Sequence, residues 1–467
     1  MKDKLKYSSC LIIPAVIALL LLYGGGKRLF INDNVDNLAN AIALEWYHYA
    51  LQAEQETEGY RGPIAARTYA YAGLAAYEAA LPALTEDYLS TAHHFPDLKL
   101  PQAAHEDEYY LPALLNGCYS KIFASFFPTA PKYMQDARRK IETKWNLVCN
   151  SKTDPLTYER SKAFGEQIAA AVFEWSVTDS VGHVAYLDPY DAGYVPPGGV
   201  GNWKPCPAFP QPALLPYWGN VRPFIVEKRD FPIKPLPTYS ADPSSVYYSQ
   251  ALEVYTLNSP LSKENLWIAE FWSDDQPGLT FSPSGRWISI VSQVIEKEQP
   301  EIGKTLETYL KTGLALNDAI IACWHYKYHF NLERPETYIT RVFDPEWRPV
   351  HHTPPFPAYP SGHATIGAAA AEVLTQLFGE RYSLTDKSHE GRTEFKGTPR
   401  AYHSFYEMAF ENAFSRIPLG VHFRMDCEEG MRLGFQVGKE ISSLSLQRIQ
   451  HFSSDKVKNN QQRQIVN

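Results

Sequence analysis

The sequence lacks an excess of positive charge, and this absence excludes two kinds of partner. Its 467 residues contain 44 lysines and arginines against 52 aspartates and glutamates, which gives a formal net charge of −8. A protein that binds nucleic acid or an anionic membrane surface through a basic face carries the opposite balance. Any anion site in this chain must therefore be a local group of cations within an acidic protein.

Cysteine is also scarce, with six residues in the whole chain. Apart from Cys10 in the N-terminal segment, five remain, and an odd number without metal-ligand spacing predicts neither a disulfide framework nor a zinc site. Cys323 and Cys427 lie within helical patterns and are interpreted as small core residues.

The N-terminal apolar run, residues 11–23, is short for a membrane span and follows Lys2, Lys4 and Lys6. About thirteen apolar residues rise only ~20 Å as a helix, less than the ~30 Å hydrocarbon core of a bilayer. Residues 1–30 are therefore predicted to be a signal peptide or, because no clean Ala-x-Ala site follows, an N-terminal membrane anchor. Either assignment predicts an exported protein, periplasmic or secreted, that residues 11–23 would anchor if the segment is retained.

The sequence shows neither the alternation of a β-strand nor an internal repeat. Apolar residues recur at helical spacing instead, beginning with Val35, Leu38, Ile42 and Trp46. Helices are predicted over residues 34–54, 64–83, 111–127, 132–148, 156–177, 246–256, 263–272, 287–298, 302–330, 366–378, 402–414 and 424–446. With 45% hydrophobic residues the chain can build a large core, and the predicted class is all-α.

Two proline-rich stretches interrupt the helical pattern. Prolines recur between residues 182 and 243, where Trp203 and Trp218 are interleaved with them, and a shorter irregular stretch covers residues 345–360. Proline at this density excludes long helices, and the aromatic residues favour packing over disorder. We interpret residues 182–243 as a packed excursion that lines the mouth of a site. The charged, turn-rich residues 379–398 are interpreted as a solvated loop.

One helix start combines the features of an oxyanion site. Pro360, Ser361, Gly362 and His363 directly precede an alanine-rich helical run. The first backbone N–H groups of a helix have no partner within it, and the helix dipole adds positive potential at that end. Serine at this position also serves as an ordinary N-cap, so the assignment depends on the flanking sequence.

Two flanking stretches supply the charge that such a site needs. Upstream, Lys327 and Arg334 are two helical turns apart, a spacing that predicts both cations on one helix face, with Trp324 on the preceding turn. Downstream, Arg416 is followed by His422. Together with the helix start, these residues provide three fixed cations and two imidazoles.

The motifs Lys-x6-Arg-Pro, Pro-Ser-Gly-His and Ser-Arg-x5-His occur in this order between Trp324 and Asp426. They resemble the signature shared by vanadium-dependent haloperoxidases and by phosphatases of the type 2 phosphatidic acid phosphatase group. The similarity to the haloperoxidase branch extends back through the stretch from Glu270 to Asp275. The resemblance implies two four-helix bundles in one helical domain with proline-rich excursions. We assign this domain to residues 31–452, its active-site half to about residues 244–452, and a polar tail to residues 453–467.

The resemblance also implies a role for each cationic and small residue around a tetrahedral oxyanion. Lys327, Arg334 and Arg416 would bond its equatorial oxygens, and Lys327 is counted among the catalytic residues. The Ser361 hydroxyl and the Gly362 N–H would complete the cage. No acidic side chain is expected to point at the anion.

The remaining assignments concern the imidazoles and the walls of the site. By resemblance, His422 would bond the metal of a haloperoxidase through its ring nitrogen, or act as the phosphohistidine nucleophile of a phosphatase. His363 would be the acid–base group. Asp275 matches the position whose carboxylate orients the arginine of the third motif. Trp324 and Phe356 match positions that line the halide pocket of chloroperoxidase-type members.

The favoured hypothesis is a haloperoxidase that holds one orthovanadate per chain and uses hydrogen peroxide to oxidise chloride or bromide to hypohalous acid. Vanadate would act as a Lewis acid without changing its oxidation state. The alternative is a phosphatase that hydrolyses phosphate monoesters. A helical protein that only binds phosphate is weaker, because it has no use for His363 facing His422. Peroxide and halide are the expected partners, nucleic acid is not, membrane contact is expected only through the N-terminal segment, and a homodimer is left open.

Overall fold

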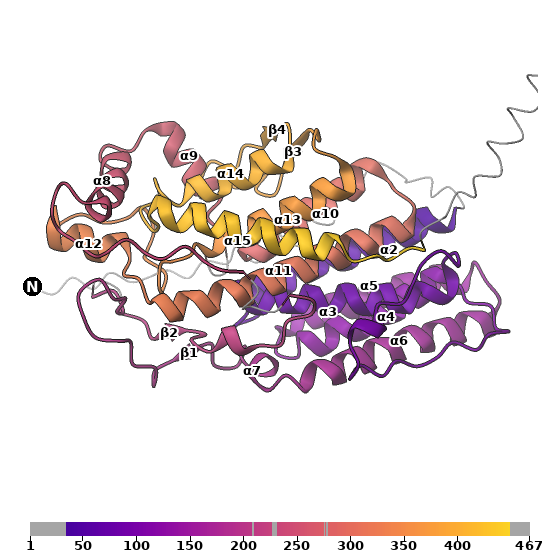
Figure 1. Ribbon diagram of the computed structural model, residues 1–467. Helices are drawn as coiled ribbons and strands as arrows, with labels where there is room; N and C mark the ends of the chain where they lie inside the picture. The colour runs from indigo at the N-terminus through magenta and orange to yellow at the C-terminus, as the bar shows by residue number, and fades with distance from the viewer. Residues whose placement is uncertain (1–33, 208–209, 227–230, 275, 277–278, 449–467) are drawn as a thin grey trace, which may run out of the picture.

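The computed structural model describes residues 34–448, apart from residues 208–209, 227–230, 275 and 277–278 (Figure 1). The predicted signal peptide or anchor, residues 1–30, and the polar tail, residues 453–467, lie outside the described residues. Among the helices that are described, none is both long and apolar enough to cross a membrane.

Helices dominate the described chain, which confirms the predicted all-α class. The helices of the first half are α2 (Val35–Glu56), α3 (Gly62–Ala80), α4 (Leu111–Phe126), α5 (Lys132–Asn150), α6 (Pro155–Val177) and the short α7 (Ser180–His183). Those of the second half are α8 (Val246–Asn258), α9 (Lys263–Phe271), α10 (Pro283–Glu298), α11 (Ile302–Phe330), α12 (Pro335–Val342), α13 (Gly362–Phe378), α14 (Phe405–Ser415) and α15 (Arg424–Ser442). Helix α12 was not predicted, although proline at its first position is a common helix start.

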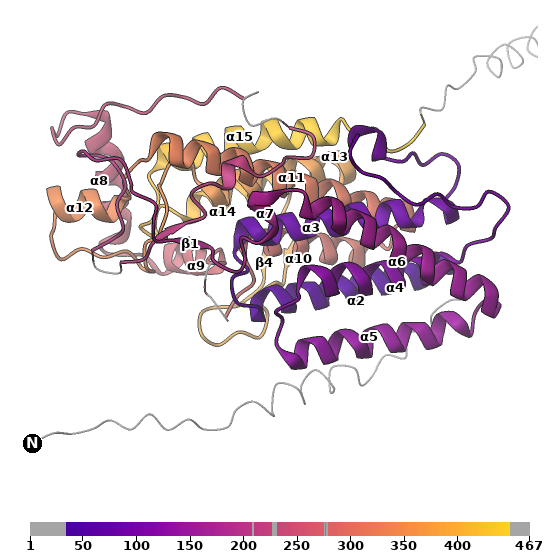
Figure 2. The same cartoon turned by 90° about the horizontal axis from the view of Figure 1, so that it is seen from below.

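The helices form two packed groups (Figures 1 and 2). In the first, α2, α3, α4 and α6 pack against one another, and α5 lies against α2 and α4. In the second, α13 packs against α11, α14 and α15, with α10 beside them. Helix α11 contacts α3 on the first group and α13 on the second, and one continuous hydrophobic core includes residues from α2 to α15. The two groups therefore share a single core.

Short antiparallel strand pairs occur within residues 182–243 and within residues 384–402, which the sequence did not predict. Strand β1 (Tyr190–Asp191) pairs with β2 (Ala213–Leu214), and β3 (Leu384–Asp386) pairs with β4 (Arg400–Tyr402). Strands of two or three residues are too short to show an alternation of polar and apolar side chains.

The interpretation of residues 379–398 as a solvated loop is wrong for its centre. Asp386 and His389 are fully buried there. Asp386 forms an ion pair with the buried Arg286 of α10, at 2.8 Å between Nη2 and Oδ2. Other charged residues of this stretch, among them Lys387, Glu390 and Glu394, are exposed as predicted.

Helices α13 and α15 approach each other closely along a row of glycines. A methyl group at Gly434 would collide with the carbonyl oxygen of Thr365, and Gly430 and Gly438 approach α13 similarly one turn to either side. Glycine is required here because the backbone of α13 occupies the space of a side chain. This contact holds the N-terminal half of α13, where the Pro-Ser-Gly-His motif begins.

We expect Gly434→Ala to lower the free energy of unfolding by about 1–3 kcal/mol, because the added methyl group forces the two helices apart. The measurement is urea unfolding followed by circular dichroism. Gly198→Ala is the control, since a Cβ at Gly198 meets no atom within 4 Å. Equal unfolding midpoints for the two variants would show that the close approach of α13 and α15 is not needed.

Candidate active site

Lys327 and Arg334 reach the same segment from two different helices. Helix α11 ends at Phe330, Asn331 has a left-handed φ of 50°, and Arg334 is the residue that precedes α12. The prediction that both cations project from one helix face is therefore wrong, because the chain turns between them. Nζ of Lys327 donates to the carbonyl oxygens of Pro357 and Ala358, each at 2.9 Å.

Arg334 completes this convergence on the proline-rich segment before α13. Its Nε donates to the carbonyl oxygen of Phe356 at 2.8 Å, and its Nη1 donates to that of Val421 at 2.8 Å. The guanidinium carbon lies 4.7 Å from the centroid of the Phe356 ring. Backbone carbonyls thus hold both cations in place.

The Pro-Ser-Gly-His motif forms the predicted helix N-terminus. Ser361 is the N-cap of α13, and its hydroxyl accepts from the N–H of Ala364 at 3.5 Å. A Cβ at Gly362 would lie 3.3 Å from the ring of Trp324, so glycine allows this ring to sit against the start of the helix. His363 follows on the first turn and is 7% exposed.

Arg416 lies at the end of α14 and joins the cage from the opposite side. Its Nη2 donates to the carbonyl oxygens of Trp272 at 2.6 Å and Ala269 at 3.3 Å. Its Nη1 lies 3.3 Å from Nε2 of His363. The third cation is therefore placed beside the proposed acid–base residue.

His422 is oriented by a carboxylate that the sequence analysis missed. Its Nδ1 lies 3.0 Å from Oδ2 of Asp426, which also accepts from the N–H of Phe423 at 3.0 Å. A proton on Nδ1 leaves the lone pair on Nε2, which lies 3.1 Å from Nη1 of Arg334. The four-residue spacing of His422 and Asp426 at the start of α15 is the feature of the sequence that could have predicted this contact. Asp426 contacts the edge of the ring that faces away from Arg334.

Burial and like charge lower the pKa values of the basic residues Lys327, His363 and His422. Burial lowers the pKa of Lys327, and the neighbouring Arg334 adds to the shift. Burial lowers the pKa of His363 well below its usual value, with Arg416 as the next cause. The same holds for His422, where Arg334 is the next cause. Positive groups crowded in a dry site favour a bound anion, because an anion would offset their repulsion.

The donor set suits an oxyanion such as vanadate better than a divalent cation. Within residues 34–448, leaving aside the short undescribed gaps, no three histidine, cysteine, aspartate or glutamate side chains gather as a metal site. The cage instead offers one imidazole nitrogen, three cations, a hydroxyl and the N–H groups of a helix start. These groups would bond vanadate through its oxygens, with His422 as the nitrogen donor.

A cavity of about 830 Å³ opens onto the cage. Trp324 and Phe356 lie side by side on its wall, with ring centroids 5.0 Å apart. The proline-rich excursion contributes Tyr190, Gln211 and Leu214 to the lining. The interpretation that residues 182–243 line the mouth of the site is therefore confirmed.

The role predicted for Asp275 stays a prediction, because Asp275 lies outside the described residues. Its neighbour Asp274 is described and is buried. Asp274 pairs with Arg286 and His389, at 3.2 Å and 3.1 Å, rather than with Arg416. All the other predicted site residues are brought together around one centre.

The comparisons with known proteins agree with this geometry. A family model described as the VCPO second helical-bundle domain matches residues 341–451, which contain the second and third motifs but not Lys327 or Arg334. The vanadium chloroperoxidase of Curvularia inaequalis is 25% identical over 279 residues, which cover 45% of this chain and 46% of that protein. The chain thus spans about half the length of the curated relative that it matches.

Solved structures extend the likeness to nearly the whole chain. A bacterial vanadium-dependent iodoperoxidase is 28% identical, with a TM-score of 0.78, and the match covers 88% of this chain and 98% of that one. A bacterial vanadium-dependent chloroperoxidase, in its apo form, shares the fold at 17% identity, with a TM-score of 0.64 over 82% of this chain and 93% of that one. With the oxyanion cage in the place that its three motifs predict, the chain is similar in fold and in motifs to the vanadium-dependent haloperoxidases.

Proposed function

We propose that this protein is a vanadate-dependent haloperoxidase that uses hydrogen peroxide to oxidise halide to hypohalous acid. The observation that carries the proposal is the pairing of two buried imidazoles, His363 and His422, across a cage of three cations. The likeness to the iodoperoxidase over most of both chains adds support. For residues 1–30 we propose export or anchoring, on the sequence alone.

Each cage residue has a part in this activity. Lys327, Arg334 and Arg416 bind the oxyanion and offset its charge, while their own carbonyl partners keep them fixed. Asp426 holds the proton on Nδ1 of His422, so the lone pair on Nε2, which lies 3.1 Å from Nη1 of Arg334, would be the one that bonds vanadium. When bound, vanadate supplies a Lewis acid that activates peroxide toward halide.

His363 is suited to move protons at the cavity wall. Its lowered pKa, caused by burial and by Arg416, keeps the imidazole neutral and able to accept a proton. His363 lines the cavity through which peroxide would enter, so Nε2 or Nδ1 can take the proton of incoming peroxide and later return it to the departing oxygen. Arg416, 3.3 Å from Nε2, keeps the ring directed toward the cage.

We further propose that bromide and chloride are substrates. Trp324 and Phe356 give the cage an apolar wall, which keeps water away from the reacting atoms. Iodide is easier to oxidise than either and serves as the positive control. The relatives named above include both chloroperoxidases and an iodoperoxidase, so the halide range has to be measured.

We expect His422→Ala to reduce bromide oxidation by about 10³-fold or more, the scale seen when an essential catalytic side chain is removed. The cationic cage remains, so weak vanadate binding should persist in isothermal titration calorimetry. His105→Ala, at an exposed position, is the matched control and should keep full activity. Near wild-type turnover in His422→Ala would refute the assignment of His422 as the metal ligand.

We expect the wild-type protein to oxidise chloride at mildly acidic pH, and Phe356→His to lose chloride oxidation by about tenfold more than bromide oxidation. The reason is that an imidazole brings water to the apolar wall, and chloride demands the stronger oxidant. Steady-state rates with the three halides are the measurement, and Phe410→His, at an exposed phenylalanine, is the control. Good bromide turnover without any chloride turnover in fully loaded protein would overturn this halide proposal.

The effect of vanadate on activity distinguishes the haloperoxidase from the phosphatase alternative. Phosphate and vanadate have the same shape, so the vanadate-free protein should hydrolyse an activated aryl phosphate slowly through His422 and His363. One equivalent of vanadate should abolish that hydrolysis and start halide oxidation, and phosphate should slow the reconstitution. Rapid hydrolysis of unactivated phosphate esters, with vanadate acting only as an inhibitor, would favour the phosphatase.

A further inference from the structure

Two buried arginines hold adjacent carbonyl groups at the end of α9. Nη2 of Arg416, in the oxyanion cage, donates to the carbonyl oxygen of Trp272 at 2.6 Å. Nη1 of Arg286, on α10, donates to the carbonyl oxygen of Phe271 at 3.1 Å. Arg286 is 0% exposed and Arg416 is 1% exposed. The last turn of α9 is thus the common anchor of a cage residue and of an arginine outside the cage.

This arrangement follows from the chemistry of a helix C-terminus. The last carbonyl oxygens of a helix have no N–H partner within it, and the helix dipole gives them extra negative potential. Buried guanidinium groups supply both the missing N–H donors and a positive charge that balances the negative potential. Arg416 takes the carbonyls of Ala269 and Trp272, and Arg286 takes that of Phe271, directly before Trp272. The position of these carbonyls therefore sets the direction of the Arg416 guanidinium.

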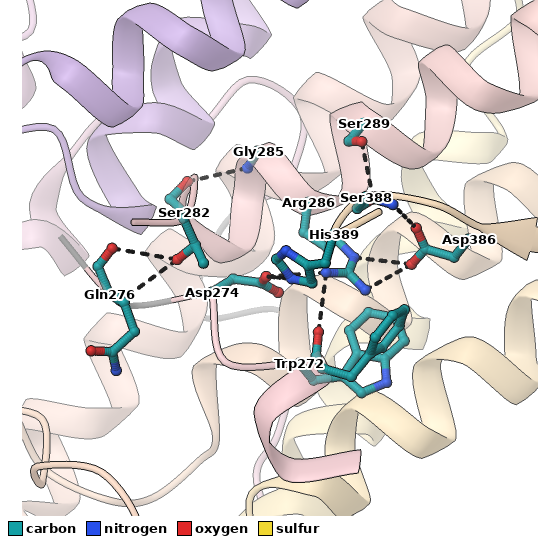
Figure 3. A network of polar contacts seen from close by, with 12 residues as sticks. Trp272, Asp274, Gln276, Ser282, Gly285, Arg286, Ser289, Asp386, Ser388 and His389 are labelled. Atoms are coloured by element: carbon teal, nitrogen blue, oxygen red, sulfur yellow. Dashed lines mark hydrogen bonds and ion pairs between the residues drawn. The ribbon is translucent and has the colours of Figure 1, made fainter. Parts of the chain in front are cut away.

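Arg286 is itself fixed by two carboxylates and two rings (Figure 3). Its Nη1 lies 3.2 Å from Oδ1 of Asp274, while its Nε and Nη2 lie 3.0 Å and 2.8 Å from Oδ2 of Asp386. Its guanidinium carbon is 4.5 Å and 4.6 Å from the ring centroids of Phe271 and Trp272. A guanidinium held by a fork of charged hydrogen bonds and by ring contacts has one orientation.

The carboxylates of Asp386 and Asp274 are held in turn by residues that do not belong to the cage. Oδ1 of Asp386 accepts from the N–H of Ser388 at 2.9 Å and from Nε2 of Gln293 at 3.2 Å. Oδ1 of Asp274 lies 3.1 Å from Nε2 of His389, whose pKa is lowered by burial and by Arg286. Because a carboxylate oxygen accepts, Nε2 of His389 is the donor in this contact. Figure 3 shows Asp274, Asp386 and His389 gathered around Arg286.

We propose that Arg286, clamped by Asp386 and Asp274, is a positioning residue for Arg416. It holds the end of α9 so that the carbonyls of Ala269 and Trp272 aim the Arg416 guanidinium at the oxyanion and at His363. The inference rests on the proposed function, because it requires that the cage binds an oxyanion. Side chains that only support a ligand residue commonly affect affinity by about 10–100-fold.

Asp386→Asn tests the proposal from the side remote from the cage. The change removes the negative charge that pairs with Arg286, and the amide NH2 must face either Arg286 or the donors Ser388 N–H and Gln293 Nε2, so the end of α9 should loosen and the Arg416 guanidinium should lose its direction. We expect vanadate and inorganic phosphate to bind the vanadate-free variant about tenfold more weakly in isothermal titration calorimetry. Urea unfolding of the same samples measures how much stability is lost.

Asp179→Asn is the matched control. Asp179 forms the buried ion pair with Arg67, at 3.5 Å between Nε and Oδ2, and both side chains are 4% exposed. This pair joins α3 to the residues before α7 and contacts no cage residue. We expect its loss to lower stability comparably while vanadate and phosphate affinity stays within about twofold of wild type. Unchanged affinity in both variants would reduce Arg286 to an ordinary structural ion pair and overturn the proposal.

Two further variants keep the test decisive. Arg286→Lys retains a cation between the carboxylates but cannot bond both of them and the Phe271 carbonyl, so it should weaken phosphate binding as Asp386→Asn does. Combined with Arg416→Lys, Asp386→Asn should add little, because both changes act through one guanidinium. Fully additive losses of phosphate affinity would contradict the proposal that Asp386 acts through the Arg416 guanidinium. If the wild-type protein binds neither vanadate nor phosphate, the oxyanion cage is refuted, and the positioning role with it.

Discussion

The structure depends on holding three like charges together away from water. Lys327, Arg334 and Arg416 are each at most 1% exposed, and two imidazoles lie among them. These positive charges would repel one another and destabilise the fold unless negative groups of fixed position surrounded them. Backbone carbonyls supply part of that compensation, and the carboxylate of Asp426 contacts His422 on the edge of the ring that faces away from Arg334. Carbonyl dipoles stabilise cations without neutralising them, which leaves the net positive potential available to an anion.

This requirement explains the irregular segments around the cage. A carbonyl can point at a cation only where it is not already bonded within a helix, so the acceptors come from helix ends and from the proline-rich stretch before α13. Proline has no N–H group, and a segment rich in it presents acceptors with few competing donors. Phe356, Pro357 and Ala358 supply three such carbonyls to Lys327 and Arg334. The prolines that break the helical pattern are thus part of the site.

Much of this molecule could be predicted from the sequence, for identifiable reasons. Most helices were found because their apolar spacing is local, and residues 302–330 were predicted with the bounds that the structure has. The cage residues were identified because each motif is a short stretch of sequence that can be recognised without knowledge of the fold. Arg334 was placed wrongly because the left-handed turn at Asn331 interrupts a spacing that looked helical. The pairing of Asp386 and His389 with Arg286 and Asp274 was missed, since about a hundred residues separate the partners and no periodicity records such contacts.

Helix α11 has a consequence for how the protein can be divided. Its 29 residues pack on α3 along one side and on α13 along another, and its last turn carries Lys327. The second and third motifs, which both lie after residue 341, therefore do not form a unit that could be transferred to another protein by itself. A piece that begins at residue 341 would lack Lys327 and Arg334, and a longer piece that begins with α11 would expose the apolar surface that now meets α3. The N-terminal helices, which carry none of the cage residues, act as the scaffold against which the charged centre is assembled.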